Sequence, residues 1–299
     1  MRKPFAFPAI FALIVICCSG CFRGWVMTDA EIRQHYSSKP VKPRFYTIKN
    51  DSVSLFCAVT GADTLPPLLV IHGAPGAWYG NRRMLDDTLI QQRFQIISVD
   101  RLGYNRSTFK NSRKPVHSMR LQAIAIREAL RLNRSGKTGV VVGSSYGAPI
   151  AAKMAILFPS DFHHLVMIAP AIDPNNEKFW WWHRFIGSGL AIKFFPEFIQ
   201  HATEEKFNHE RELAILHRQW SSLSVPVTVM HGGKDQIIAP ENFEYAKKML
   251  RDKNARFIYL PESTHMIRSN DPEAVRAAVF STIDDVRPTD AISLQQSGS

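Results

Sequence analysis

Short apolar runs alternate with longer helical patterns along most of this chain. The runs end in loop residues and resemble the β-branched stretches of buried parallel strands; they are Leu68–Ile71, Gln95–Val99, Gly139–Val142, Leu165–Ala169, Val227–Met230 and Arg256–Leu260. Helical patterns fill the intervals, at Ser118–Leu132, Tyr146–Phe158, Phe243–Arg251 and Pro272–Asp285. Strands that alternate with helices predict an α/β fold class with a mostly parallel central sheet flanked by helices.

Two regions depart from this rhythm. The segments "RFYTIKN" and "VSLFCAV", which begin at Arg44, alternate in polarity and favour antiparallel strands. The interval 173–224 is too long for a structureless loop, and its part Thr203–Trp220 has a polar helical pattern. We therefore predict an α/β core over 44–172 and 225–286, a helical cap over 173–224 and a flexible polar tail over 287–299. The run Trp180–Trp182 in the cap either packs on the sheet or lines an apolar pocket or membrane interface.

The first residues form an export signal. Met1-Arg2-Lys3 is basic, and the apolar run Phe5–Cys18 is shorter than the roughly 20 residues that span a bilayer. Residues 1–20 are therefore predicted to be a signal peptide. Ser19-Gly20-Cys21 resembles the lipobox of bacterial lipoproteins, although Cys18 stands where that family usually carries leucine. The resemblance implies acylation of Cys21, a tether over 21–43 and attachment to a bacterial cell membrane, facing the periplasm in a Gram-negative cell; secretion without a lipid is the alternative.

Charge and cysteine content narrow the possible partners. The formal net charge of +11 falls to +9 without Arg2 and Lys3, and ten Lys or Arg against one acid, Glu128, lie within Arg101–Lys137. No nucleic-acid-binding motif accompanies them, which argues against nucleic acid; a solvated helical face and an anionic membrane surface both fit. Once Cys21 is acylated, Cys57 has no partner in the mature chain and reads as a small apolar strand residue.

The stretch "VVVGSSYGAP" carries the chemistry. Its valines predict a buried strand, and Gly143-Ser144-Ser145-Tyr146-Gly147 fits a strained turn that exposes the Ser145 hydroxyl before a helix. A serine needs a base and an acid to become a nucleophile. Asp235, in "MHGGKD", and His265, in "LPESTHM", each follow a predicted strand, so they reach the same sheet edge. We predict a Ser145, Asp235 and His265 triad, with Asp173 as the rival acid.

The chain resembles the α/β-hydrolase superfamily over residues 44–285. The matching motifs are "HGAPG" at His72–Gly76, "DRLGYNRS" at Asp100–Ser107, the elbow Gly143–Gly147, the acid loop Gly232–Asp235 and the terminal His265. Asn105 and Thr264 stand where the family commonly has glycine. The resemblance implies a serine hydrolase that forms an acyl-enzyme, with the amides of Ala74 and Tyr146 as the oxyanion hole and no cofactor.

Three functions fit this pattern. A carboxylic ester hydrolase for small substrates with apolar acyl groups is the first. A proline-iminopeptidase-like aminopeptidase shares the motifs and would need acids near the pocket, for which Glu204 and Glu205 are candidates. A non-catalytic binding protein that retains the fold is the third. The other histidines show no spacing typical of a metal site, and the pattern does not indicate an oligomeric state.

The lipid anchor can be tested directly. Cys21→Ala removes the thiol that would carry the acyl chains, so we expect the protein to leave the membrane fraction when it is expressed in bacteria. Washing membranes with high salt and with carbonate separates lipid attachment from electrostatic adhesion. Tight attachment of the variant through both washes would contradict the anchor.

Overall fold

The computed structural model describes residues 26–177 and 195–283. The predicted signal peptide 1–20, Cys21, the run Trp180–Trp182 and the tail 287–299 lie outside these ranges. Within the described parts of the chain, no helix combines the length and the apolar character that crossing a bilayer requires.

A nine-stranded sheet forms the centre of the molecule, with the order β1-β2-β4-β3-β6-β7-β8-β9 and β5 paired to β2. The pairs β1–β2, β2–β4 and β2–β5 are antiparallel, and the pairs β4–β3, β3–β6, β6–β7, β7–β8 and β8–β9 are parallel. The strands are β1 Arg44–Lys49, β2 Val53–Thr60, β3 Pro67–Ile71, β4 Gln95–Val99, β5 Thr108–Phe109, β6 Gly139–Ser144, β7 Phe162–Ile168, β8 Val227–Gly232 and β9 Ala255–Leu260. The predicted α/β fold class is confirmed, and the strands lie where the apolar runs indicated; only the short β5 was not anticipated.

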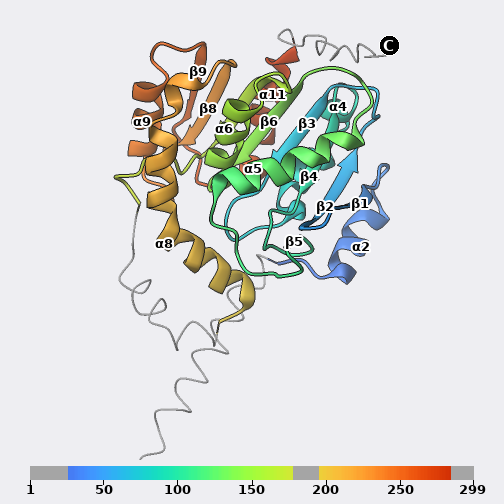
Figure 1. The fold of residues 1–299 in the computed structure, drawn as a ribbon. Helices are drawn as coiled ribbons and strands as arrows, with labels where there is room; N and C mark the ends of the chain where they lie inside the picture. The colour runs from blue at the N-terminus through green and yellow to red at the C-terminus, as the bar shows by residue number, and fades with distance from the viewer. Residues whose placement is uncertain (1–25, 178–194, 284–299) are drawn as a thin grey trace, which may run out of the picture.

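Helices cover both faces of the sheet, as Figure 1 shows. One apolar core joins the sheet to α5 Met119–Arg127, α6 Gly147–Leu157, α8 Glu197–His217 and α9 Glu241–Met249. A second core, on the opposite face, joins it to α2 Asp29–Ser37, α3 Arg82–Leu85, α4 Thr88–Gln91, α10 Ile267–Asn270 and α11 Pro272–Phe280. Because both faces are buried, the central strands are apolar at successive positions instead of alternating. Cys57 is fully buried in β2, as its apolar setting suggested.

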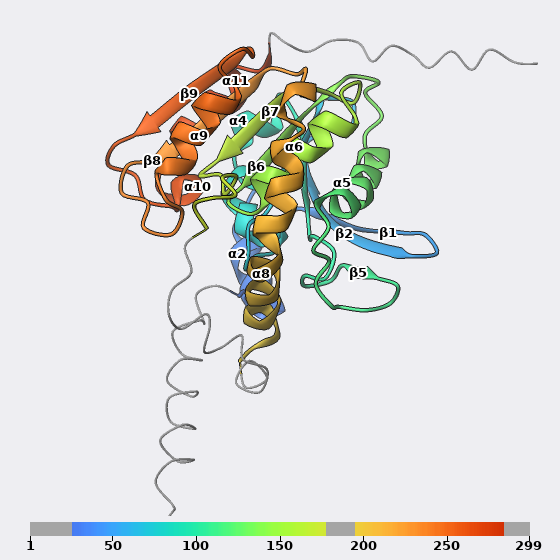
Figure 2. The same ribbon diagram turned by 60° about the vertical axis from the view of Figure 1, so that its left-hand side comes forward.

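Helix α8 supplies the described part of the predicted cap. It begins at Glu197, earlier than the polar pattern at Thr203 indicated. Figure 2 shows it passing in front of α6 and continuing beyond the sheet. Its last turns bury Leu213 and Leu216 in the core, whereas the part of the helix before them buries polar side chains, among them Glu205 and His209. Buried polar groups need partners, so this earlier part of α8 docks through hydrogen bonds and ion pairs.

Much of the basic charge in Arg101–Lys137 is neutralised within the fold. Five of the ten cations pair with carboxylates of described residues, four of them distant in sequence; the pairs are Arg101–Glu205, Arg106–Asp29, Arg127–Asp161, Arg131–Glu128 and Arg134–Asp63. The excess of cations in this part of the sequence is therefore smaller in the folded protein, because carboxylates from distant parts of the chain lie beside them.

Glu177 links α8 to the turn after β6. Its carboxylate lies 2.6 Å from Nδ1 of His209 and 3.1 Å from Nζ of Lys206, both on α8, and the Tyr146 hydroxyl donates to it at 3.1 Å. The Tyr146 and His209 rings stack with centroids 4.0 Å apart. Burial by itself would raise the pKa of Glu177, but the His209 hydrogen bond and the charge of Lys206 outweigh it and lower the pKa to about 2. The ionised carboxylate therefore stabilises the docking of α8.

Glu177→Gln tests this contribution. The pKa of Glu177 is lower in the folded protein than its ordinary value of 4.5, so its stabilising effect is complete above about pH 5 and is lost as pH falls toward 2. We expect wild type to exceed the variant in unfolding free energy at pH 6, and this gap to shrink by on the order of 2 kcal/mol at pH 3. Urea unfolding followed by tryptophan fluorescence measures both values. A gap that does not change with pH would contradict the assignment.

Candidate active site

The turn between β6 and α6 holds Ser145 in a left-handed backbone conformation, with φ of 53°. Non-glycine residues rarely adopt this region, and strain of this kind needs support from the surrounding structure. The support is backbone packing: a Cβ on Gly143 would lie 2.3 Å from the Gly147 carbonyl oxygen, and a Cβ on Gly147 would lie 2.5 Å from that of Ile71. The Ser145 N–H donates to the Ile168 carbonyl of β7 at 2.9 Å. The two glycines predicted from the motif are thus required by contact.

The structure brings Asp235 and His265 together. Oδ2 of Asp235 lies 2.7 Å from Nδ1 of His265, and its Oδ1 accepts the N–H groups of Ile237 and Ile238, both at 2.9 Å. Burial raises the pKa of Asp235, but the hydrogen bond and charge of His265 and these two amides lower it below its ordinary value overall. An ionised carboxylate on Nδ1 leaves Nε2 of the ring free to accept a proton.

The loops that carry these two residues are in backbone contact. A Cβ on Gly232 would lie 2.5 Å from the carbonyl oxygen of Ser263 and 2.6 Å from that of Thr264. Glycine is therefore needed in the acid loop to let the loop after β9 approach. The threonine that replaces the family's usual glycine before the histidine is accommodated, since Thr264 Oγ1 accepts the Met266 N–H at 3.3 Å.

The rival acid, Asp173, is engaged elsewhere. Its carboxylate accepts the Asn175 N–H and the Asn176 side-chain amide, and its own N–H donates to Asn242. Asp173 therefore stabilises the turn after β7, while His265 bonds to Asp235.

The loop His72–Gly76, here called the oxyanion loop, lies directly against Ser145. A Cβ on Gly73 would lie 2.9 Å from the Ser145 Cβ, so a side chain there would collide with the candidate nucleophile. His72 is fully buried; its Nδ1 lies 2.7 Å from the Gly73 carbonyl oxygen and its Nε2 accepts the Arg101 N–H at 3.0 Å. Burial and the nearby Arg101 charge lower the pKa of His72 well below its ordinary range. The ring is neutral, with its proton on Nδ1, and serves a structural role.

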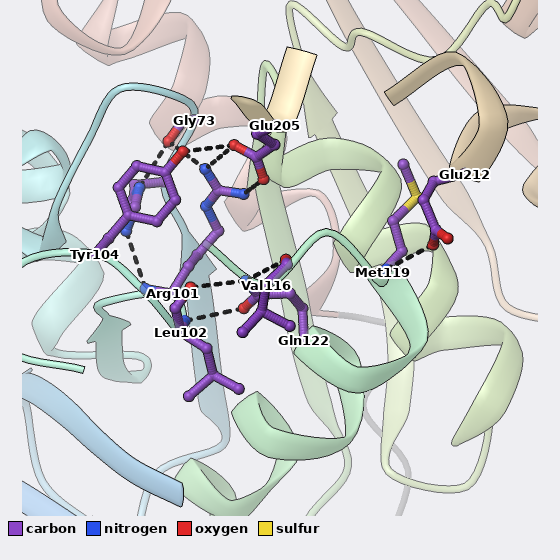
Figure 3. Close-up of polar contacts among 10 residues, drawn as sticks. Gly73, Arg101, Leu102, Tyr104, Val116, Met119, Gln122, Glu205 and Glu212 are labelled. Atoms are coloured by element: carbon purple, nitrogen blue, oxygen red, sulfur yellow. Dashed lines mark hydrogen bonds and ion pairs between the residues drawn. The ribbon is translucent and has the colours of Figure 1, made fainter. Parts of the chain in front are cut away.

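Beneath this loop lies a buried ion pair that sequence reasoning did not anticipate. The Arg101 guanidinium forms two hydrogen bonds with the Glu205 carboxylate, and the Tyr104 hydroxyl donates to the same carboxylate at 2.6 Å (Figure 3). Arg101 is fully buried and Glu205 is 7% exposed. Burial raises the pKa of Glu205, but Arg101 and Tyr104 together lower it, so the carboxylate is charged. No local pattern marks this pair, because its members come from the loop after β4 and from α8.

The backbone conformation of Asn105 is consistent with its place in the motif, where the family commonly has glycine. Its φ is 49°, in the left-handed region that glycine adopts without strain and asparagine tolerates better than most residues. Its side-chain amide donates to Asp100 at 2.8 Å. Asn105 therefore holds a backbone conformation that glycine also adopts readily.

A cavity of about 210 Å³ opens beside the oxyanion loop. Its wall includes Pro75 and Gly76 of that loop, Tyr104, and Phe198 and His201 from the first turns of α8. The cavity is thus bounded by the oxyanion loop and the cap, with both aromatic and polar groups in its lining. Among the described residues, no group of three or more His, Cys, Asp or Glu side chains is arranged to hold a metal ion.

Known proteins give a consistent family assignment. The family described as the α/β-hydrolase fold matches residues 66–221. A rice protein (Oryza sativa subsp. japonica) named "Probable 1-acylglycerol-3-phosphate O-acyltransferase" is 28% identical over 44% of this chain and 32% of its own length. The AB hydrolase superfamily protein YfhM of Bacillus subtilis (strain 168) is 23% identical over 40% of this chain and 41% of its own length. The chain thus spans well under half of these relatives.

Solved structures agree on the fold. The crystal structure of a membrane phospholipase A, described as a bacterial virulence factor, superimposes with a TM-score of 0.62 over 92% of this chain and 93% of that one. The two sequences are 16% identical, so this likeness concerns architecture. With the parallel sheet, the strained turn after β6 and the family match over 66–221, the chain belongs to the α/β-hydrolase fold family.

Proposed function

We propose that this chain is a serine hydrolase that cleaves carboxylic esters with apolar acyl groups through an acyl-enzyme. The observation that carries the proposal is the 2.7 Å contact between Asp235 and His265, on loops at the same sheet edge as the strained Ser145 turn. A buried, ionised aspartate that binds Nδ1 of a histidine orients the ring so that Nε2 can accept a proton from a serine hydroxyl.

In the acylation step, Ser145 Oγ attacks the ester carbonyl carbon while His265 Nε2 takes the hydroxyl proton. The carbonyl oxygen becomes an oxyanion, which the N–H groups of Ala74 and Tyr146 stabilise. The intermediate then collapses: the C–O bond to the alcohol breaks, and His265 returns the proton to the departing oxygen. Asp235 keeps the imidazole oriented and stabilises its charged form.

In the deacylation step, water replaces the alcohol. His265 removes a proton from the water as its oxygen attacks the acyl carbon, and the same two amides hold the second oxyanion. Cleavage of the bond to Ser145 Oγ releases the carboxylic acid, and the proton returns to the serine. The cycle consumes one water and leaves the chain unchanged.

The partners of Glu204 and Glu205 favour an ester over an amino-terminal proline peptide. An aminopeptidase of this type needs a free carboxylate for the substrate's ammonium group. Glu205 is occupied by Arg101 and Tyr104. Glu204 is exposed and lies 3.1 Å from His117. Neither acid is available without breaking an existing contact, and an ester of an apolar acid needs neither.

One comparison fits the same acyl chemistry. The rice relative is named as an O-acyltransferase, and hydrolysis is acyl transfer in which water is the acceptor. The proposed anchor at Cys21 would hold the enzyme at a membrane, where esters of apolar acids concentrate. Export and lipid attachment are part of this proposal and depend on the Cys21 test.

The nucleophile can be tested with a fluorophosphonate probe, which reacts with activated serines. We expect covalent labelling of wild type and none of Ser145→Ala, because the substitution removes the attacking oxygen. His265→Ala should reduce labelling by about 10²-fold or more, since the base is lost. In-gel fluorescence of the purified proteins measures all three. Absence of labelling in wild-type protein would favour a binding protein that retains the fold.

Substrate class can be tested by parallel assays of aryl esters across acyl chain lengths and of prolyl arylamides. We expect ester turnover that depends on Ser145 and no detectable arylamide turnover. Spectrophotometric release of the aryl group measures both reactions in one format. Turnover of the arylamides alone would replace the ester proposal with the aminopeptidase.

A further inference from the structure

Glu205, on α8, lies far along the chain from the oxyanion loop, yet it is joined to that loop through one buried side chain, that of Arg101. Arg101 Nη2 donates both to Glu205 Oε2, at 2.9 Å, and to the carbonyl oxygen of Gly73, at 3.0 Å. The same carbonyl oxygen accepts from His72 Nδ1. The guanidinium therefore connects the cap to the backbone of the oxyanion loop.

The Gly73 carbonyl belongs to the same peptide unit as the Ala74 N–H. This unit is trans, and in a planar trans peptide the C=O and N–H bonds point in opposite directions. Holding the Gly73 oxygen toward Arg101 and His72 therefore turns the Ala74 N–H away from them. If this peptide rotated, the carbonyl would lose two donors and the N–H would leave its present direction. Because Gly73 lies against Ser145, the orientation of the Gly73–Ala74 peptide determines whether the Ala74 N–H can donate to a substrate bound at Ser145.

Arg101 can donate to the Gly73 carbonyl only while its own guanidinium is fixed in place by other contacts. Its Nη1 and Nη2 both bind Glu205, and its guanidinium carbon lies 4.5 Å from the centre of the Tyr104 ring. Tyr104 also donates to Glu205, which closes the network. A buried arginine without its carboxylate would seek solvent or another partner, because an unpaired buried charge is strongly unfavourable. Figure 3 shows the network converging on Glu205 from α8.

We infer that Glu205 is a positioning residue for the oxyanion hole, acting through Arg101 on the Gly73–Ala74 peptide. This inference rests on the proposed function, because it assigns a role in stabilising the acyl-transfer oxyanion. It makes the hole dependent on docking of α8: the donor peptide has its active orientation when the cap helix delivers the Glu205 carboxylate.

The same helix supplies a matched control. Glu212 also lies on α8 and also contacts the core, accepting the Met119 N–H at 2.8 Å. That contact caps α5 and does not touch the oxyanion loop, as the separation of the two groups in Figure 3 shows. Glu205→Gln and Glu212→Gln each remove one negative charge from α8. Only Glu205→Gln should alter the orientation of the Gly73–Ala74 peptide.

We expect Glu205→Gln to lower kcat for an aryl ester by roughly 10- to 100-fold, with KM changed by less than about threefold. Loss of a whole oxyanion donor typically costs ~10²–10³ in kcat, and a misdirected donor costs part of that. Glu212→Gln should keep kcat within about twofold of wild type. Steady-state kinetics give these values, and thermal unfolding reports the fold of each variant.

A double variant separates positioning from simple stability. Arg101→Met with Glu205→Gln removes both buried charges, which often restores stability lost when one partner is removed. The double variant should unfold near the wild-type temperature and still have a low kcat, because no donor from position 101 reaches Gly73. Recovery of kcat together with stability would overturn the inference, as would a folded Glu205→Gln protein with wild-type kcat. Wild-type activity no higher than that of Ser145→Ala would instead overturn the proposed function, and this inference with it.

Discussion

Close backbone packing around the turn after β6 is the constraint on which the rest of the site depends. Gly143 and Gly147 leave no room for a side chain, and Gly73 brings the oxyanion loop against Ser145. These contacts hold Ser145 at a positive φ that the residue would otherwise avoid. The order of β3, β6 and β7 in the sheet places the three backbones within reach of one another. The strained backbone of Ser145 is therefore supported by the central parallel strands of the sheet.

The second level of organisation is electrostatic and involves the cap. Helix α8 binds the core through apolar contacts in its last turns and, before them, through ion pairs that involve Glu205, Lys206 and His209. Glu205 meets Arg101 beneath the oxyanion loop, and Glu177 ties His209 and Lys206 to Tyr146. Of the two proposed oxyanion donors, Tyr146 stacks on His209 of α8, and Ala74 is linked to α8 through Gly73 and Arg101. Replacing a buried ion pair by well-packed apolar residues is often neutral for stability, so the Arg101–Glu205 pair suits a role in orientation.

Sequence patterns anticipated a large part of this arrangement for identifiable reasons. The apolar runs marked the strands because a sheet covered on both faces leaves no polar positions in its central strands. Gly143 and Gly147 could be recognised because a turn of that sharpness tolerates few other residues. Asp235 and His265 could be paired in advance because each follows a strand end, and parallel strands end at one edge. Asp235 was preferred to Asp173 from its loop motif, and in the structure His265 bonds to Asp235, whereas Asp173 binds Asn175 and Asn176.

What the sequence by itself determined is the α/β class, the strand positions and the chemical types gathered at one sheet edge, because these depend on local periodicity and short motifs. What only the tertiary structure decided is the partner of each buried charge. Glu205 looked from sequence like an acid available for a substrate amine, yet it is fully engaged by Arg101 and Tyr104. Half of the cations in Arg101–Lys137 found acids of described residues, four of them distant in sequence. Pairing of this kind depends on three-dimensional proximity and on the cost of leaving a charge buried alone, and neither is visible in the order of residues.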